Sequence, residues 1–150
     1  MVNIYDYENS KLYLSYSNKA IFNLDIREPI TVISGESASG KTLLVSCIND
    51  VVQNIRLNQS GDTPNIIAFD KKFSITEVEE LPYSLVVIDR ADLILTEEDV
   101  KYIRKDNLHH YLIYTRAFLD LDLTPNYFGE FKSKGKEIVI EYDFSEGCWF

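Results

Sequence analysis

Hydrophobic and polar positions alternate in short segments near both ends of the chain. A period of two is typical of strands with one buried face, and it predicts strands over 12–16, 20–26 and 137–144. The turn-like residues 17–19 separate the first two segments, so we expect an antiparallel hairpin there. The segment 129–135 contains glycine at both ends, and we expect it to be a turn region before the last strand.

The middle of the chain contains apolar runs without alternation. Such runs are expected of parallel strands that are covered on both faces. They are 29–34, 66–70, 84–89 and 111–115.

Helical patterns separate these runs. Apolar residues at helical spacing predict an amphipathic helix over 42–58. Ser74 and the glutamate three residues later form the pattern of a capping box, which opens a short helix over 75–80. Thr96 is followed by three acidic residues, which indicates a third helix over 97–106.

The order of these elements predicts the fold class. Strands alternate with helices in the middle of the chain, and extended segments lie at both ends. We therefore expect a three-layer α/β core with a mainly parallel sheet, to which antiparallel N- and C-terminal strands are added. The 150 residues suit a single domain, 1–150.

A glycine-containing segment between an expected strand and an expected helix carries the strongest chemical signal. Residues 35–42 read Gly-Glu-Ser-Ala-Ser-Gly-Lys-Thr and match the phosphate-binding pattern G-x-x-x-x-G-K-[ST] in its strand–loop–helix context. Backbone amides of such a loop and the helix N-terminus attract phosphate oxygens. The residues expected to bind nucleotide are Gly35, Glu36, Ser37, Ala38, Ser39, Gly40, Lys41, Thr42 and Leu43.

Three side chains are expected to complete this site. Lys41 would reach the β- and γ-phosphates of ATP or ADP, and the Thr42 hydroxyl would hold Mg²⁺. Asp89 directly follows an apolar strand, and ligands bind at the carboxyl ends of strands in open parallel sheets. We expect Lys41 and Asp89 to be catalytic, and Thr42 and Asp89 to bind the metal. The alternative is that Asp89 only caps the next turn.

An additional strand, 66–70, is expected between the loop helix and the strand that ends in Asp89. This order resembles the additional-strand class of P-loop ATPases, and within it the ATP-binding-cassette and chromosome-maintenance type. Residues 21–42 look like that family's N-terminal hairpin and phosphate loop. Residues 85–92 look like its second nucleotide motif, and 111–116 look like the strand that ends in its switch residue. The resemblance implies a minimal P-loop NTPase core that binds ATP.

The chain departs from the family's pattern where the resemblance implies catalysis. Arg90 stands where the family has a glutamate, and Thr115 and Arg116 stand near the expected switch histidine. The chain has no Leu-Ser-Gly-Gly signature, and the segment 70–89 is too short for the helical subdomain that carries one. The resemblance thus implies a weak or partner-dependent ATPase. The alternative is a nucleotide-dependent binding module that does not hydrolyse ATP.

Other motifs give only weak support for a GTPase, a small-molecule kinase or a metal-binding protein. Residues 62–65 faintly resemble a GTPase acid motif, but the chain has no Asn-Lys-x-Asp guanine reader. A small-molecule kinase needs an arginine-bearing lid, and the segment 120–131 contains no arginine. His109 and His110 have no Cys or acidic partner at metal-ligand spacing, so we interpret them as polar residues that lead into a strand.

The composition of the chain indicates which partners and which cellular compartment are expected. Tyr13, Tyr16 and Phe22 precede the loop, where an adenine-stacking ring would lie, but core packing is favoured in a chain with 10 Tyr and 8 Phe. Cys47 and Cys148 without a secretory signal suggest a reducing cytoplasm. A formal charge of −9 disfavours nucleic acid, and no apolar run would span a membrane. A protein partner or a homo-oligomer is left open.

Overall fold

The computed structural model describes residues 3–33, 40–58, 63–115 and 128–142. Its elements follow in the order β1 (Tyr5–Asp6), β2 (Lys11–Tyr16), β3 (Ala20–Asp25), β4 (Ile30–Ile33), α1 (Lys41–Asn58), β5 (Ile66–Phe69), α2 (Ile75–Glu79), β6 (Leu85–Ile88), α3 (Ala91–Ile94), α4 (Glu97–Lys105), β7 (His110–Tyr114), β8 (Phe128–Lys134) and β9 (Glu137–Tyr142).

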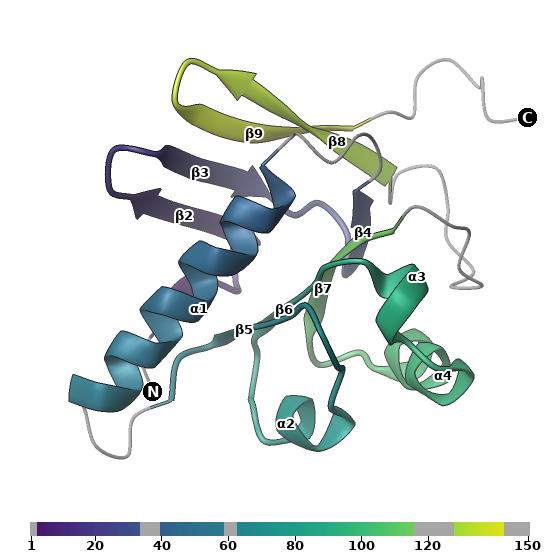
Figure 1. Ribbon diagram of the computed structural model, residues 1–150. Coiled ribbons are helices and arrows are strands. Elements are labelled where there is room, and N and C mark those ends of the chain that lie inside the picture. The colour runs from purple at the N-terminus through teal and green to yellow at the C-terminus, as the bar shows by residue number, and fades with distance from the viewer. Residues whose placement is uncertain (1–2, 34–39, 59–62, 116–127, 143–150) are drawn as a thin grey trace, which may run out of the picture.

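The strands of the described residues form one sheet in the order β1-β2-β3-β9-β8-β4-β7-β6-β5 (Figure 1). Strands β4, β7, β6 and β5 are parallel to one another, whereas β1, β2 and β3 are antiparallel. The β8–β9 hairpin is inserted between these groups. Its strand β8 is parallel to β4, and its strand β9 is parallel to β3. The sheet is mixed, and its two longest pairings, β2–β3 and β8–β9, are antiparallel over six residue pairs each.

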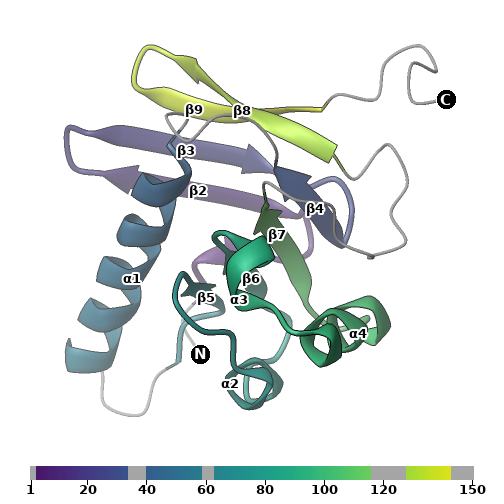
Figure 2. The same cartoon turned by 45° about the vertical axis from the view of Figure 1, so that its right-hand side comes forward.

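Helix α1 lies across one face of the curved sheet (Figure 2). Its buried side chains share one core with apolar residues of β2, β3, β5, β6, β7, β8 and β9. Leu44, Ile48 and Val52 are buried, which confirms the predicted apolar stripe. No helix in the described part of the chain is long and apolar enough to cross a membrane.

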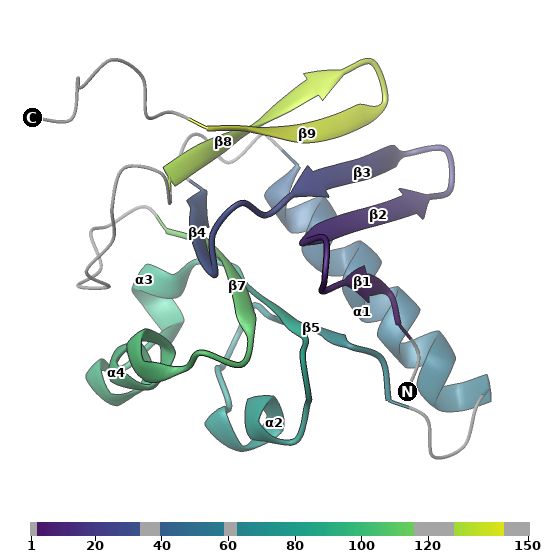
Figure 3. The same cartoon turned by 180° about the vertical axis from the view of Figure 1, so that it is seen from behind.

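The three short helices pack on the opposite face, but only over the parallel strands (Figure 3). Val78 of α2, Ala91 of α3 and Ile103 of α4 form a second core with Val86 and Ile88 of β6. In the ranges that the structure describes, no helix covers the outer face of β2, β3 and β9 (Figure 3).

The predicted three-layer α/β core with a mainly parallel sheet is therefore wrong. The continuous apolar runs correctly indicated the parallel strands, but these are four of nine strands in the sheet. The helices on the second face have only 5, 4 and 9 residues, so they cover part of the sheet and do not form a complete layer. The terminal segments contribute the longer pairings.

Segment 129–135, which we expected to be a turn region, forms most of strand β8. Gly129 lies within this strand, where a Cβ would approach Ile140 Cγ2 to 2.9 Å. The turn itself is shorter and is formed at Gly135, whose φ is +66°. Glycine at 129 therefore reflects close packing across the hairpin rather than a turn.

The two edge strands of the sheet approach each other at Asn65, which precedes β5. Its buried Oδ1 accepts hydrogen bonds from the amides of Ile4 (2.6 Å) and Tyr5 (2.9 Å). Its Nδ2 donates to the Tyr5 carbonyl at 2.6 Å. The side-chain amide thus bonds to β1 as a neighbouring strand would, and it fixes one edge of the sheet to the other.

We predict that Asn65→Ala lowers the free energy of unfolding by about 2–4 kcal/mol, because it leaves buried backbone groups of Ile4 and Tyr5 without partners. Urea unfolding of both proteins measures the difference. The control is Asn9→Ala, which removes an exposed hydrogen bond to Asp6 and should cost less than about 0.5 kcal/mol. Equal losses in the two variants would show that Asn65 does not hold the edges together.

Candidate functional site

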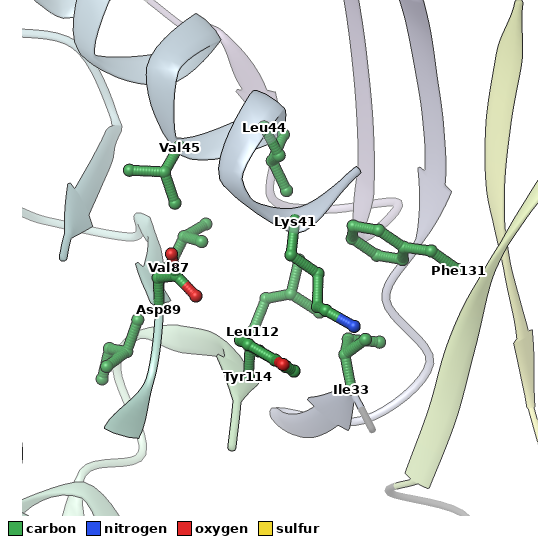
Figure 4. A pocket seen from close by; sticks show the side chains of 10 residues that line it. Ile33, Lys41, Leu44, Val45, Val87, Asp89, Leu112, Tyr114 and Phe131 are labelled. Carbon is green, nitrogen blue, oxygen red and sulfur yellow. The ribbon is translucent and has the colours of Figure 1, made fainter. Parts of the chain in front are cut away.

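The carboxyl ends of three parallel strands meet the N-terminus of α1 at one small pocket (Figure 4). Strand β7 lies between β4 and β6, so the ends of all three strands are at the same edge of the sheet. The pocket has a volume of about 10 Å³, room for roughly one water molecule. Residues that line it include Ile33, Lys41, Leu44, Asp89, Tyr114 and Phe131.

Lys41 is the first residue of α1, and only 4% of it is exposed. Its ammonium Nζ lies 4.1 Å from the centroid of the Tyr114 ring, which is within the range of a cation–π contact. Burial of an ammonium is costly unless other groups compensate it. The ring of Tyr114 supplies part of that compensation.

Gly40 begins the turn into α1, and its carbonyl accepts the amide hydrogen bond of Leu44 at 2.9 Å. Its φ is +96°, a backbone conformation that side chains disfavour. A Cβ at this position would also come within 2.9 Å of Ile138 Cδ1 on β9. The backbone angle therefore favours the second fixed glycine of the phosphate-loop motif, and a side chain there would in addition displace the Ile138 methyl.

Asp89 directly follows β6, as predicted, and its side chain is half-buried. Its amide donates to the Phe69 carbonyl at 2.9 Å, which extends the pairing of β6 with β5 beyond the strand. The carboxylate lines the same pocket as Lys41 (Figure 4). The structure thus brings together the two residues that the sequence analysis considered catalytic.

Arg90 turns the chain from β6 into α3. It has left-handed backbone angles (φ 60°, ψ 54°), which strain a residue other than glycine. Its guanidinium donates two hydrogen bonds to the Asp92 carboxylate, at 3.1 Å from Nε and 2.7 Å from Nη2. The hydrogen bonds to Asp92 raise the pKa of Arg90. Arg90 is therefore paired beside the site as a permanent cation.

Thr42 and Leu43, which were also predicted to bind nucleotide, do not line this pocket. Thr42 is exposed on the first turn of α1, and Leu43 is half-buried against the main core. Residues 35–39 lie outside the described residues, as does Arg116. Lys41 and Asp89 are the predicted residues that line the pocket.

Tyr114 and Phe131 also line the pocket, and neither was predicted from the sequence. Tyr114 is the last residue of β7, at the same sheet edge where Asp89 follows β6. Ligands bind at the carboxyl ends of parallel strands, and this rule, which identified Asp89, applies equally to Tyr114. Phe131 lies in β8, in the segment that we expected to be a turn. Its part in the pocket depends on the long-range insertion of that hairpin.

The two histidines have structural roles. His110 begins β7, which confirms that this pair leads into a strand. His109 is buried and its Nδ1 is hydrogen-bonded to Asp106 at 2.6 Å. Burial alone would lower the pKa of His109, but the hydrogen bonds to Asp106 and to the Leu81 carbonyl raise it. Burial lowers the pKa of His110.

The aromatic residues before the loop do not line the pocket. Phe22 is fully buried in the main core, which confirms core packing for this residue. Tyr16 donates a hydrogen bond to Asp50 at 2.7 Å, and Tyr13 is exposed on β2. Cys47 is a buried free thiol, whereas Cys148 lies outside the described residues.

The comparisons with known proteins assign no family. No protein-family model matches the chain, and no curated protein matches its sequence. The function is therefore inferred from the residues of the site.

We predict that Gly40→Ala destabilises the protein more than Gly135→Ala, although both glycines have positive φ. Each substitution imposes about 1 kcal/mol of backbone strain. Only Gly40→Ala also displaces Ile138, which adds about 0.5–1.5 kcal/mol for an off-rotamer side chain. Urea unfolding measures both costs.

A second substitution isolates the contact. Ile138→Val removes Cδ1, so the additional cost of Gly40→Ala should disappear when it is measured in the Ile138→Val protein. An unchanged cost would mean that α1 does not begin against β9 as described.

Proposed function

We propose that this chain binds ATP or ADP with Mg²⁺ through residues 35–43. The observation that carries the proposal is the position of Lys41, which follows a glycine at positive φ, begins an 18-residue helix and lines one pocket with Asp89. A helix N-terminus attracts anions. A lysine at that point adds a full positive charge directed at a phosphate.

The size of the pocket bears on where the nucleotide would bind. Room for one water excludes a nucleotide from the pocket itself, so the phosphates would lie outside it, against the N-terminus of α1. The Lys41 ammonium would then exchange part of its contact with Tyr114 for phosphate oxygens. The ring of Tyr114 would keep the lysine stem in place during this exchange.

The donor groups suit a magnesium ion that arrives with a nucleotide. Among the described residues, no group of three or more His, Cys, Asp and Glu side chains could hold a metal by itself. Mg²⁺ in nucleotide sites typically needs only one or two protein oxygens in addition to phosphates. Thr42 and Asp89 would provide these oxygens, and the bound ion would neutralise charge on the β- and γ-phosphates.

Turnover is proposed to be slow or to depend on a partner. The residue after the metal acid is Arg90, which cannot accept a proton, and its guanidinium is paired with Asp92. A nucleotide-dependent binding module without hydrolysis is the second candidate, and this ion pair is the observation that favours it.

The charge of the chain and its buried thiol bear on the macromolecular partner and on the cellular compartment. We propose a cytoplasmic location, which the buried free thiol of Cys47 supports. The formal charge of −9 favours a protein over a nucleic acid as the macromolecular partner.

Lys41→Met is expected to weaken the binding of Mg-ADP by about 1.5–3 kcal/mol, because it removes a charge-assisted contact and keeps an unbranched, buried stem. Calorimetric titration measures the loss. Lys101→Met on α4, where the lysine is exposed, is the control and should bind as the wild type does. Asp89→Asn should weaken binding only when Mg²⁺ is present. Equal affinities of wild type and Lys41→Met would remove the basis of the proposal.

The wild-type protein alone should hydrolyse ATP far more slowly than the typical enzyme turnover of about 10 per second. Arg90→Glu supplies a group that can orient a water molecule, but it also places that group beside Asp92. The double variant Arg90→Glu/Asp92→Asn removes this repulsion and should give the larger increase in the single-turnover rate. Arg90→Gln is the control without a base, and brisk turnover by the wild type would contradict the assignment.

A further inference from the structure

An open groove of about 710 Å³ lies at the opposite ends of the strands from the Lys41 pocket. Residues 3–8, Asn65 and Tyr83 line it. Asn65 precedes β5 and Tyr83 precedes β6, so the groove is at the N-terminal ends of these strands. It is therefore separate from the site proposed for nucleotide.

Aromatic rings line and support this groove. The ring of Tyr83 contacts that of Tyr7 edge to face, with centroids 5.3 Å apart. Tyr7 in turn stacks on His110 at 4.1 Å, and the Tyr5 hydroxyl is hydrogen-bonded to His110 Nδ1 at 2.6 Å. Burial lowers the pKa of His110 and thus favours the neutral form of the imidazole beneath Tyr7. The ring cluster offers π-faces without a positive charge of its own.

Tyr83 is the exposed member of this cluster. It is 58% exposed and has a φ of +34°. Glycine adopts such angles without the steric cost that a side chain incurs, so the tyrosine is held there at some strain. An exposed aromatic ring on a strained turn is a feature of ligand-binding surfaces.

Two acidic residues, Asp6 and Glu8, also line the groove. Asp6 and Glu8 are exposed, and neither forms an ion pair with another described residue. Hydrogen bonds from the side chain and the backbone of Asn9 lower the pKa of Asp6 and orient its carboxylate. Lys11 is the register neighbour of Asp6 on β2, but it does not line the groove.

We propose that this groove binds an arginine-bearing segment of a basic protein partner. The guanidinium would stack on the exposed ring of Tyr83 and pair with Asp6 and Glu8. Arginine suits these groups better than lysine, because its planar fork both stacks on rings and bonds carboxylates in a bidentate manner.

Charge decides between the possible occupants. A second copy of this chain, or a nucleic acid, would bring negative charge to a protein whose formal charge is already −9. A basic segment is attracted both by the whole protein and by the two local carboxylates. The groups at the groove then provide the specificity that the overall charge lacks.

The test is a titration of the full chain with the peptide acetyl-Gly-Arg-Gly-Arg-Gly-amide, followed by amide chemical shifts. Saturable shifts are expected at Tyr7, Asp6 and Tyr83. The peptide with citrulline in place of arginine keeps the shape without the charge and should give none. The lysine peptide should bind roughly two- to fivefold more weakly, because it loses the stacking contact.

Tyr83→Gly separates binding from folding, because glycine fits the observed φ. This variant should be at least as stable as the wild type. Its affinity for the arginine peptide should be roughly two- to fivefold lower than that of the wild type. Tyr13→Ala removes a ring that is 62% exposed on β2, and it should bind normally.

A charge control completes the experiment. Asp6→Asn/Glu8→Gln should reduce binding roughly two- to fivefold, as expected for surface ion pairs, whereas Glu97→Gln/Glu98→Gln at the start of α4 should not. Shifts spread over all acidic surfaces would overturn the proposal, as would equal binding by Tyr83→Gly and wild type or equal losses in the two charge variants.

Discussion

Burial of the apolar stripe of α1 is the interaction on which the rest of the structure depends. Leu44 and Ile48 are almost inaccessible, and each such side chain contributes about 1.5–3 kcal/mol relative to an exposed one. Their core takes side chains from both the N-terminal hairpin and the parallel strands, which are far apart in the sheet order. A flat sheet could not cover one helix from both directions. The curvature also brings the edge strands together, where the amide of Asn65 joins them.

The same packing explains why the site is where it is. Because α1 is fixed along its length, its first residue, Lys41, is placed at the carboxyl ends of β4, β6 and β7. The β8–β9 hairpin closes this region from the other side, with Phe131 in the pocket and Ile138 against Gly40. Residues near positions 40, 89, 114 and 131 thus meet through long-range pairing, although the motif itself is local.

Sequence patterns predicted the elements better than their arrangement. The strands at 66–69, 85–88 and 110–114 and the helix α1 were expected within a residue or two. Burial of a strand on two faces leaves a continuous apolar run, and burial of a helix on one stripe leaves a helical period, so both can be read locally. The fold class was not predicted, because the position of β9 beside β3 depends on pairing between residues more than 100 positions apart. Gly129 was misleading for a related reason, since glycine marks both turns and close strand packing. Asp89 was placed correctly because the strand-end rule needs only the strand itself.

Strands β6 and β7 connect the two proposed sites. Tyr83 precedes β6 and Asp89 follows it, while β7 runs from His110 beneath Tyr7 to Tyr114 against Lys41. Four or five residues in a strand span roughly 13–17 Å, which exceeds the Debye length of about 8 Å at physiological ionic strength. Charges at one surface therefore act weakly on the other.

Both strands are also buried and closely packed, and such cores resist continuous deformation. Any coupling between a basic partner and a nucleotide would thus require a discrete shift of β6 or β7, and the simpler expectation from this geometry is that the two sites bind independently.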